Sequence, residues 1–416
     1  MERPSFYKIL SDSLSFLCIL ILAFGFGSSQ LIGGIDNNYI LFIAMMPFYL
    51  VSSVGLARSW RKISSSAVIA IVISLTMVFL WAYSVMMGII NGNNLFFIIQ
   101  NNAGVIGYLI LIPLIFAKTD MKIVSILRLS GIIVMLTTIL LKLLSSFAGW
   151  DVTSNLSQTI FGPFVGDGGV RWGRIFTYAQ YLVCVPVMYY LVEIFTSKDV
   201  NYFRRVVQIL TIFLGLYVIF SISMSKGMQL AIIFSALLTF LAYLRSSRFG
   251  WKLAILAILF SSACLSVYLS AFPSNIISEN FFSEEDISNV ARYEQLRYII
   301  DDIKLFGNGS GATILNYSRA EGQDYGFELS YIALFHKFGI LGVIPIILYV
   351  VTILSIIHLC DTTSKLSNSA ALISAMSFLM PAIGNPGLFS LQETITHSMV
   401  ITAVFKYRSL SLIAVD

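Results

Sequence analysis

The sequence predicts an all-α, polytopic integral membrane protein, and its composition is the first reason. Hydrophobic residues make up 57% of the 416 residues, charged residues only 11%, and the mean hydropathy is +0.86. Soluble domains carry roughly 25% charged residues. This chain has too few charges to cover a soluble surface, which excludes a soluble enzyme, a disordered chain and a disulfide-stapled scaffold. We interpret residues 1–416 as a single transmembrane domain.

The second reason is the number of long apolar stretches. A helix needs about 20 apolar residues to cross a bilayer, and about twelve stretches approach that length. The first is interpreted as a retained helix, because no small-residue cleavage site follows it. The predicted transmembrane helices lie at about residues 9–27, 38–57, 66–88, 95–117, 123–146, 175–196, 205–224, 228–245, 252–272, 338–360, 368–389 and 393–405.

The third reason is the distribution of basic residues, which also orients the helices. With the N-terminus in the cytoplasm, sixteen Lys and Arg residues fall on cytoplasmic segments and eight on outer segments. Cytoplasmic loops of membrane proteins carry an excess of Lys and Arg, so we place both termini in the cytoplasm. The outer basic residues are Arg171, Arg174, Lys226, Arg292, Arg297, Lys304, Arg319 and Lys337.

Two outer segments, at about 148–174 and 273–327, are much longer than the cytoplasmic connections. In the second segment, we expect Ser288 to cap an amphipathic helix over 289–306. The glycine-rich run 307–311 is expected to end that helix. The large outer loop therefore contains structure of its own.

No metal or other cofactor is expected. The histidines His336, His358 and His397 show no HxxxH or HxxE spacing, and the four cysteines show no CxxC spacing. The cysteines lie in or beside apolar runs, which predicts buried thiols. The sequence also carries no basic patch typical of a nucleic-acid-binding protein, so no nucleic acid is expected as a partner.

Basic residues from three distant parts of the sequence are predicted on the outer side. Arg171 and Arg174 precede the sixth predicted helix, Lys226 lies in the tight turn after the seventh, and Arg292 lies on the loop helix. Each one alone would be solvated or would face lipid headgroups. Together they form the kind of cluster that a diphosphate requires, because guanidinium groups bind phosphate oxygens bidentately and Lys adds a point charge.

Most outer acidic residues, with Glu393 counted among the outer set, are expected to be solvated. Glu328 differs, because the stretch FELSYIALF surrounds it with apolar residues at the entrance to the tenth predicted helix. A carboxylate held in such surroundings can act as a general base. Pairing with an outer Arg for structure is an equal alternative.

Four outer segments carry patterns that occur together in one known superfamily. They are RWGRIFTYAQYL with Arg171, SMSKGMQLAI with Lys226, ARYEQLRYIIDDIKLFGNGSG with Arg292, and ELSYIALFHKFGILG with Gly339 and Gly342. In this order they resemble the motifs of the O-antigen polymerase and O-antigen ligase superfamily. These are membrane glycosyltransferases that act on undecaprenyl-diphosphate-linked sugars at the periplasmic face.

This chain departs from the superfamily pattern at three positions. Arg174 stands where Gly is usual, and Lys226 stands where Arg is common, which keeps the charge but loses bidentate geometry. Ligases of the superfamily carry a His eleven residues before the first glycine of the last motif, and here that position is Glu328. His336 lies only three residues before Gly339. The last departure favours a polymerase over a ligase.

The resemblance implies glycosyl transfer between two lipid-linked glycans in the bacterial inner membrane, with the active site facing the periplasm. The partners implied are undecaprenyl-diphosphate-linked oligosaccharides and a membrane-bound chain-length regulator; no cofactor is implied. Glu328 is the expected general base, and Arg171, Lys226 and Arg292 are expected to hold the diphosphate. Secondary substrate-binding residues are Arg174, Arg297, Arg319 and His336. Tyrosines that can stack on sugar rings, or anchor the loop at the interface, are Tyr293, Tyr298, Tyr317 and Tyr325.

Three other functions stay open from the sequence. A ligase would transfer finished glycan to lipid A-core. A lipid-linked oligosaccharide flippase would need charges along a path inside its bundle, whereas the midpoints of these predicted helices are nearly free of charge. A secondary transporter would need interrupted helices in both halves, and only the stretch 381–391 suggests such a break.

Overall fold

Helices dominate the part of the chain that the computed structural model describes. Its only strands are the two-residue β1 (Gln30–Leu31) and β2 (Ile35–Asp36), which pair antiparallel. The prediction of an all-α fold is therefore confirmed for this part. The described residues are 6–24, 30–31, 35–36, 65–100, 103–111, 114, 122–149, 175, 178–197, 201–246, 287–314, 327, 329–360, 365–383, 388 and 390–410.

The helices follow the predicted apolar stretches closely along most of the chain. The α-helices are α1 (Phe6–Phe24), α3 (Ser65–Ile90), α4 (Leu95–Gln100), α6 (Ile123–Ala148), α8 (Cys184–Thr196), α9 (Tyr202–Tyr217), α10 (Lys226–Ser246), α13 (Ile287–Asp301), α14 (Ser330–Phe338), α15 (Val343–Leu359), α16 (Leu366–Ala375) and α17 (Leu391–Leu410). The other helical turns are η2 (Ala103–Ile110), η3 (Tyr178–Val183), the π-helical η4 (Val218–Ile222), η5 (Gly339–Gly342), η7 (Met376–Leu379) and η8 (Pro381–Ile383).

Seven helical stretches within the described residues are long and apolar enough to cross a membrane. These long apolar helices indicate a multi-pass, membrane-embedded protein, as the composition predicts. The count of twelve stays a prediction, because 38–57 and 252–272 lie outside the described residues. The seven stretches are Val68–Ile90, Ile123–Ala148, Ala179–Thr196, Tyr202–Ile222, Lys226–Arg245, Ser330–Leu359 and Leu366–Ile383.

The described part of the fourth predicted helix, 95–117, is interrupted by a 3-10 stretch. It contains the short α4 and the 3-10 helix η2. The helix η2 passes very close to α17, because a Cβ on Gly107 would overlap the side chain of Thr394. The hydroxyl of Thr394 also donates a hydrogen bond to the carbonyl of Gly104 at 2.7 Å. The break therefore reflects a close tertiary contact, which hydropathy does not report.

Small residues allow the central helices to approach one another. Helix α16 packs against α8 and α10, and its buried face includes Ser369, Ala370, Ser374 and Ala375. A Cβ on Gly215 of α9 would overlap Val187 of α8. Helices in a membrane associate through such small-residue interfaces, because lipid offers no hydrophobic driving force between them.

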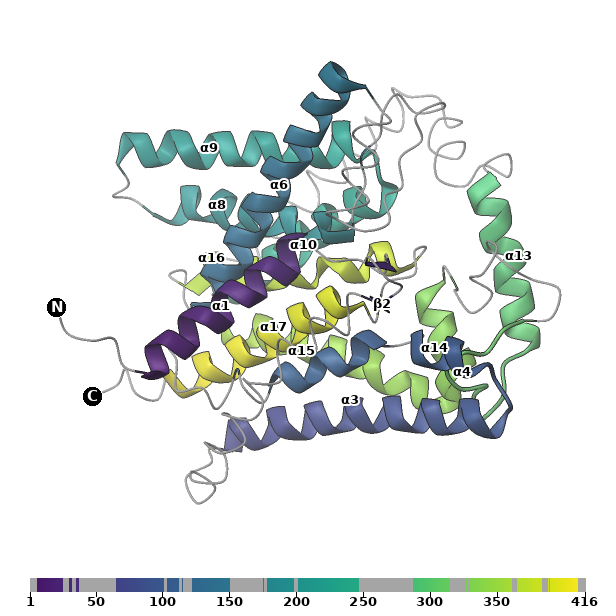
Figure 1. Cartoon of the computed structure of the whole chain (residues 1–416). Helices are drawn as coiled ribbons and strands as arrows, with labels where there is room; N and C mark the ends of the chain where they lie inside the picture. Colours follow the sequence, from purple (N-terminus) through teal and green to yellow (C-terminus); the bar gives the residue numbers. More distant parts are fainter. Residues whose placement is uncertain are drawn as a thin grey trace.

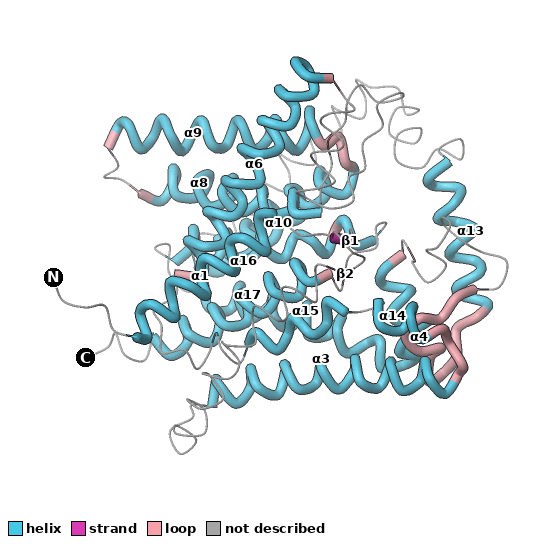
Figure 2. Tube along the Cα trace, viewed as in Figure 1, coloured by secondary structure: helices cyan, strands magenta, loops and turns pink. Residues whose placement is uncertain are grey.

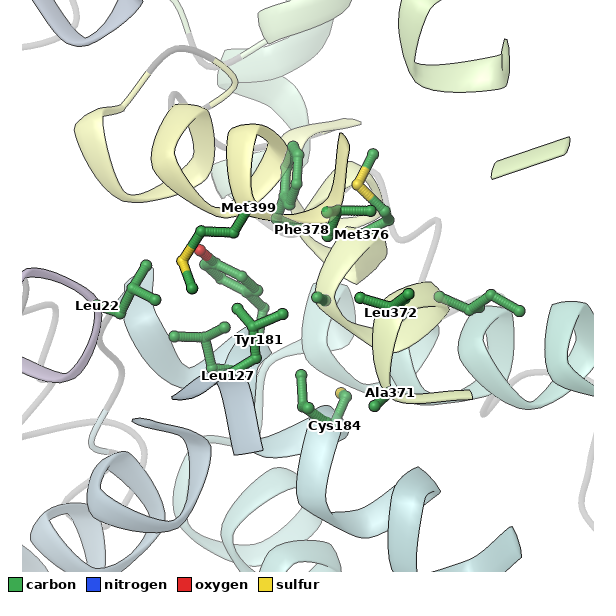
Figure 3. Close-up of a cluster of buried hydrophobic side chains, with 14 of the residues drawn as sticks. Leu22, Leu127, Tyr181, Cys184, Ala371, Leu372, Met376, Phe378 and Met399 are labelled. Carbon is green, nitrogen blue, oxygen red and sulfur yellow. The ribbon is translucent and has the colours of Figure 1, made fainter. Parts of the chain in front are cut away.

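The main core lies where these helices meet. Figure 3 shows side chains from α1, α6, η3, α8, α16, η7 and α17 converging around Tyr181 and Phe378, whose rings are 5.7 Å apart in an edge-to-face contact. Tyr181 also shares a 2.9 Å hydrogen bond with the hydroxyl of Thr396. The core thus fixes α17 against η3, which contains the last residues of the first outer motif.

Long helices such as α3 and α9 run side to side in Figure 1, whereas α13 runs across them at one end of the molecule. The tube in Figure 2 shows the same arrangement, with the loops around α4 gathered near α13. The start of α1 and the end of α17 lie at the opposite end. Which side of the membrane each end faces stays a prediction.

Polar contacts mark the end that we predict to be cytoplasmic. Glu193 forms a 2.7 Å ion pair with Arg204 and accepts a hydrogen bond from Gln208 at 2.5 Å. The guanidinium group of Arg128 lies 4.6 Å from the ring centroid of Tyr189, a cation–π contact. Five helical residues from α6, α8 and α9 therefore meet at this end through polar and cation–π contacts.

Candidate functional site

Four of the eight predicted site residues can be placed in the structure. They are Lys226, Arg292, Arg297 and His336. The other four lie outside the described residues: Arg171, Arg174, Arg319 and Glu328. Each of the four sequence motifs nevertheless has described residues within it or directly beside it.

The turn before Lys226 has an unusual backbone. The π-helix η4 precedes it, and Met224 has a φ of 45°, the only positive φ of a non-glycine residue in the described part of the chain. Both features are uncommon and occur often at functional sites. Lys226 is half-buried and is the first residue of α10. A helix N-terminus repels a cation and favours an anion. A lysine at this position is therefore more favourable when it binds a negatively charged group.

The first motif meets the second at this turn. The backbone N–H of Ile175, the residue after Arg174, donates to the carbonyl of Ile222 at 3.1 Å. The carbonyl of Ile175 accepts a hydrogen bond from the buried side chain of Gln180, also at 3.1 Å. The first motif is thereby held, at Ile175, on the π-helix that ends shortly before Lys226.

Helix α13 presents Arg292 and Arg297 on different faces. Arg292 is half-buried and shares a face with the buried Gln295 and Ile299, at spacings of three and seven residues. Arg297 is exposed. The prediction that Ser288 caps this helix is wrong, because Ser288 lies inside it. The helix also ends at Asp301, five residues earlier than the predicted end at residue 306.

The third motif meets the fourth beside α13. The side-chain oxygen of Gln295 accepts a hydrogen bond from the backbone N–H of Leu329, the residue after Glu328, at 3.1 Å. Since α13 packs on α14, the helix that carries Arg292 is fixed to the start of the fourth motif. Gln295 was not predicted as a site residue, and nothing in its local sequence marks it.

His336 is buried at the junction of α13 and α14. Its Nε2 lies 2.9 Å from a carboxylate oxygen of Asp302, its ring contacts that of Phe327 at 5.0 Å, and its Nδ1 has no hydrogen-bond partner in the described part of the chain. The neighbouring Lys337 is also buried, with Nζ 5.5 Å from the ring centroid of Phe327. His336 thus joins the end of α13 to α14, and its role in substrate binding stays a prediction.

The glycine-rich run 307–311 forms a tightly packed joint among α3, α13 and α14. Its three glycines all have φ between 71° and 80°, and a Cβ on Gly309 would overlap the backbone of Gly88 in α3. The backbone N–H groups of Asn308 and Gly309 donate to the carbonyls of His336 and Lys337 at 2.7 and 3.0 Å. Only glycine combines this backbone conformation with so close an approach.

Contacts through η8 connect the two pairs of motifs. The hydroxyl of Tyr331 in α14 donates to the carbonyl of Leu379 at 2.9 Å, just before η8. On the other side, a Cβ on Gly227 in α10 would lie 3.0 Å from the Cα of Pro381. Described residues from all four motifs therefore belong to one connected group of segments at the same end of the bundle.

Two buried polar groups on α17 were not predicted. Glu393 is only 4% exposed, and its carboxylate accepts hydrogen bonds from the backbone N–H and hydroxyl of Ser390 at 3.2 and 2.6 Å. This is a capping box, in which Ser and the Glu three residues later satisfy the helix start. The expectation that outer acids are mostly solvated is wrong for Glu393, and the pattern SLQE was its readable signal.

His397 lies one turn further along α17 and is fully buried. Its Nδ1 lies 2.7 Å from the hydroxyl of Tyr108, and its Nε2 lies 3.0 Å from that of Thr352. The hydroxyl of Tyr349 donates to the carbonyl of Leu388 at 3.3 Å. Both ring nitrogens of His397 are satisfied, so this network serves to hold η2, α15 and α17 together.

Comparisons with known proteins add no relative. No protein-family model matches the chain, and a search of curated proteins finds no similar sequence. Within the residues that the structure describes, no group of three or more His, Cys, Asp or Glu side chains is placed to hold a metal ion.

Proposed function

We propose that this protein is a surface-polysaccharide polymerase of the bacterial inner membrane. It would join undecaprenyl-diphosphate-linked oligosaccharide repeat units at the periplasmic face. The observation that supports this proposal is the connection of all four motifs at one end of the bundle, through the bonds of Ile175 with Ile222, Gln295 with Leu329, and Tyr331 with Leu379. We infer that a shared anionic substrate is the reason why segments so far apart in sequence, each with a basic residue in its motif, are connected in this way.

The proposed reaction is a glycosyl transfer. A hydroxyl oxygen of the acceptor sugar attacks the anomeric carbon of the donor, and the bond from that carbon to the diphosphate oxygen breaks. The hydroxyl proton passes to a general base, for which we propose Glu328, and undecaprenyl diphosphate leaves with its negative charge. Arg171, Lys226 and Arg292 would stabilise that charge, since fixed cations act most strongly where charge develops.

Two placed residues suit this role by their positions. Lys226 stands at the N-terminal end of α10, where backbone N–H groups also favour an anion. Arg292 is half-buried on the face of α13 that is fixed to Leu329. Arg174, Arg297, Arg319 and His336 would contact the glycan or the diphosphate less directly. The chain-length regulator remains a proposed partner.

The test is the surface glycan of a deletion strain, compared on a gel with the strain complemented by the native gene. A polymerase predicts core capped by one repeat unit, with no ladder, and a ladder restored on complementation. Bare core with long polymer still on the carrier lipid would indicate a ligase instead. Bare core with single lipid-linked repeats on the cytoplasmic side would indicate a flippase and would overturn the proposal.

A further inference from the structure

Two exposed apolar residues lie in the turn that follows the end of α13. Leu305 and Phe306 are 65% and 64% exposed. Their backbone is nevertheless fixed by hydrogen bonds. The carbonyl of Leu305 accepts one from the backbone N–H of Ile340 at 3.0 Å, and the carbonyl of Phe306 accepts one from the hydroxyl of Tyr83 at 2.7 Å. Large apolar side chains in water on a fixed turn are unfavourable. The surfaces next to Leu305 and Phe306 therefore indicate whether water or lipid covers these two side chains.

The exposed pair continues the outward-facing surfaces of two membrane-spanning segments. Exposed apolar residues recur along α3 at Val68, Val72, Leu75, Phe79, Met86 and Ile90. A second row follows the segment Ser330–Leu359 at Ile340, Val343, Ile347, Val350 and Leu354. Both rows have the three- and four-residue spacing of one helix face. Tyr83 lies near the last turns of α3 and Ile340 begins the second row, so Leu305 and Phe306 lie beside the last turns of the first row and at the start of the second.

The depth of the turn is set by the same contacts. The twenty residues from Ile340 to Leu359 span about 30 Å, which is the thickness of the hydrocarbon core. The backbone N–H of Ser310 donates to the carbonyl of Ser84 at 2.8 Å. Ser84 lies six residues, or about 9 Å, before the end of α3 at Ile90. The glycine-rich turn therefore runs alongside the last turns of a membrane-spanning helix and does not stand above it.

The backbone N–H groups at the centre of this turn are all hydrogen-bonded. All four N–H groups from Gly307 to Ser310 donate to carbonyls, and the carbonyl of Asn308 accepts from Asn91 and Asn93 at 3.1 and 2.9 Å. Non-helical backbone at membrane depth occurs only where protein satisfies its polar groups. A loop tip in water would not need all of these N–H groups to be bonded within the protein.

From these three observations we infer that residues 303–311 form a re-entrant element in the leaflet on this side of the membrane, with Leu305 and Phe306 in contact with lipid. Lys304, exposed between Ile303 and Leu305, then reaches the phosphate groups with its flexible side chain. The occupant of the exposed surface is the bilayer itself. The element would place the C-terminal end of α13 at the membrane boundary, in a segment that the sequence predicted as an aqueous loop.

The inference is tested with spin labels on single cysteines in the full-length protein. The native cysteines Cys18, Cys184, Cys264 and Cys360 are replaced by Ala, and the protein is reconstituted in phosphatidylethanolamine–phosphatidylglycerol vesicles. Labels at Leu305→Cys and Phe306→Cys are compared with Phe79→Cys on the outward face of α3 and with Tyr293→Cys, whose side chain is 78% exposed on α13. Accessibility to oxygen and to a water-soluble nickel chelate is measured at each site.

We expect labels at 305 and 306 to collide with oxygen as the label at 79 does, and several-fold less with the nickel chelate than the label at 293. Nickel accessibility equal to that at 293 would overturn the inference, and so would a label that neither reagent reaches. Phe306→Trp gives a second reading without a label, since lipids brominated on their acyl chains should quench its added fluorescence. None of these measurements needs a glycan substrate, so they stand apart from the proposed activity.

Discussion

The side-chain oxygen of Gln295 accepts a hydrogen bond from the backbone N–H of Leu329 at 3.1 Å, and this bond joins the helix of Arg292 to the residue after Glu328. Gln295 is fully buried. Its carboxamide therefore fixes one proposed substrate-binding element relative to the other.

Gln295→Leu should shorten or abolish the polymer ladder while the protein still inserts in the membrane. The change leaves the Leu329 N–H without its partner, which costs about 1–3 kcal/mol locally and releases the start of α14 from α13. Ladder length and membrane abundance are measured together. Glu294→Leu is the matched control on the exposed side of the same helix. Equal ladders from the two variants would contradict a positioning role for Gln295.

Arg292→Ala and Arg297→Ala should differ, because α13 turns the two side chains to different faces. Loss of the half-buried Arg292 should abolish polymer, whereas loss of the exposed Arg297 should leave a reduced ladder. Arg292→Lys keeps the charge but not the bidentate geometry, so a partial ladder is expected. Glycan gels at matched protein abundance decide the matter, and a normal ladder from Arg292→Ala would remove Arg292 from the proposed diphosphate site.

Gly309→Ala should destabilise the fold much more than Gly92→Ala. Both glycines have positive φ, at 80° and 74°, which costs a non-glycine residue about 1–2 kcal/mol. A Cβ on Gly92 meets nothing within 4 Å, whereas one on Gly309 overlaps the backbone of Gly88. Thermal unfolding in detergent gives both costs, and the difference isolates the packing contribution. Equal melting temperatures would show that α3 and the glycine-rich turn are not in close contact.

Tyr108→Phe should lower stability more than Tyr83→Phe. The first change removes a hydroxyl that lies 2.7 Å from Nδ1 of His397 in the core, leaving a buried nitrogen unpaired at a cost of about 1–2 kcal/mol. The second removes an exposed bond to the carbonyl of Phe306 and leaves no buried side chain without a partner. The readout is again unfolding in detergent, and His397→Phe combined with Tyr108→Phe should recover part of the loss.

Hydropathy alone was sufficient to predict most of the long helices, because a bilayer imposes length and apolarity locally on each stretch. The predicted 66–88, 123–146 and 228–245 correspond to α3, α6 and α10 with small shifts at their ends. The interruption within 95–117 was not predictable in this way. It depends on the approach of Gly107 to Thr394, almost three hundred residues away.

The site was predictable in part for a similar reason. Charge and apolar context single out Lys226 and Arg292 from the sequence, since a charged residue beside a membrane helix is conspicuous. Gln295 and Gln180 carry no such signal, because a neutral amide becomes informative only when its partner is known. Glu393 carried a readable signal in the pattern SLQE, but its burial follows from the packing of α17 inside the bundle.

The glycine-rich turn has a mechanical consequence. Asp302 and Asn308 tie the end of α13 to α14 and α3, while Gly339, with φ of 58°, is the bend between α14 and α15. Any tilt of α3 or α15 is therefore transmitted to α13 and to the angle at which Arg292 is presented. Membrane helices tilt to match the thickness of the surrounding lipid. In the proposed reaction, bilayer thickness thereby becomes a variable, and lipids of different chain length should change the length of the polymer.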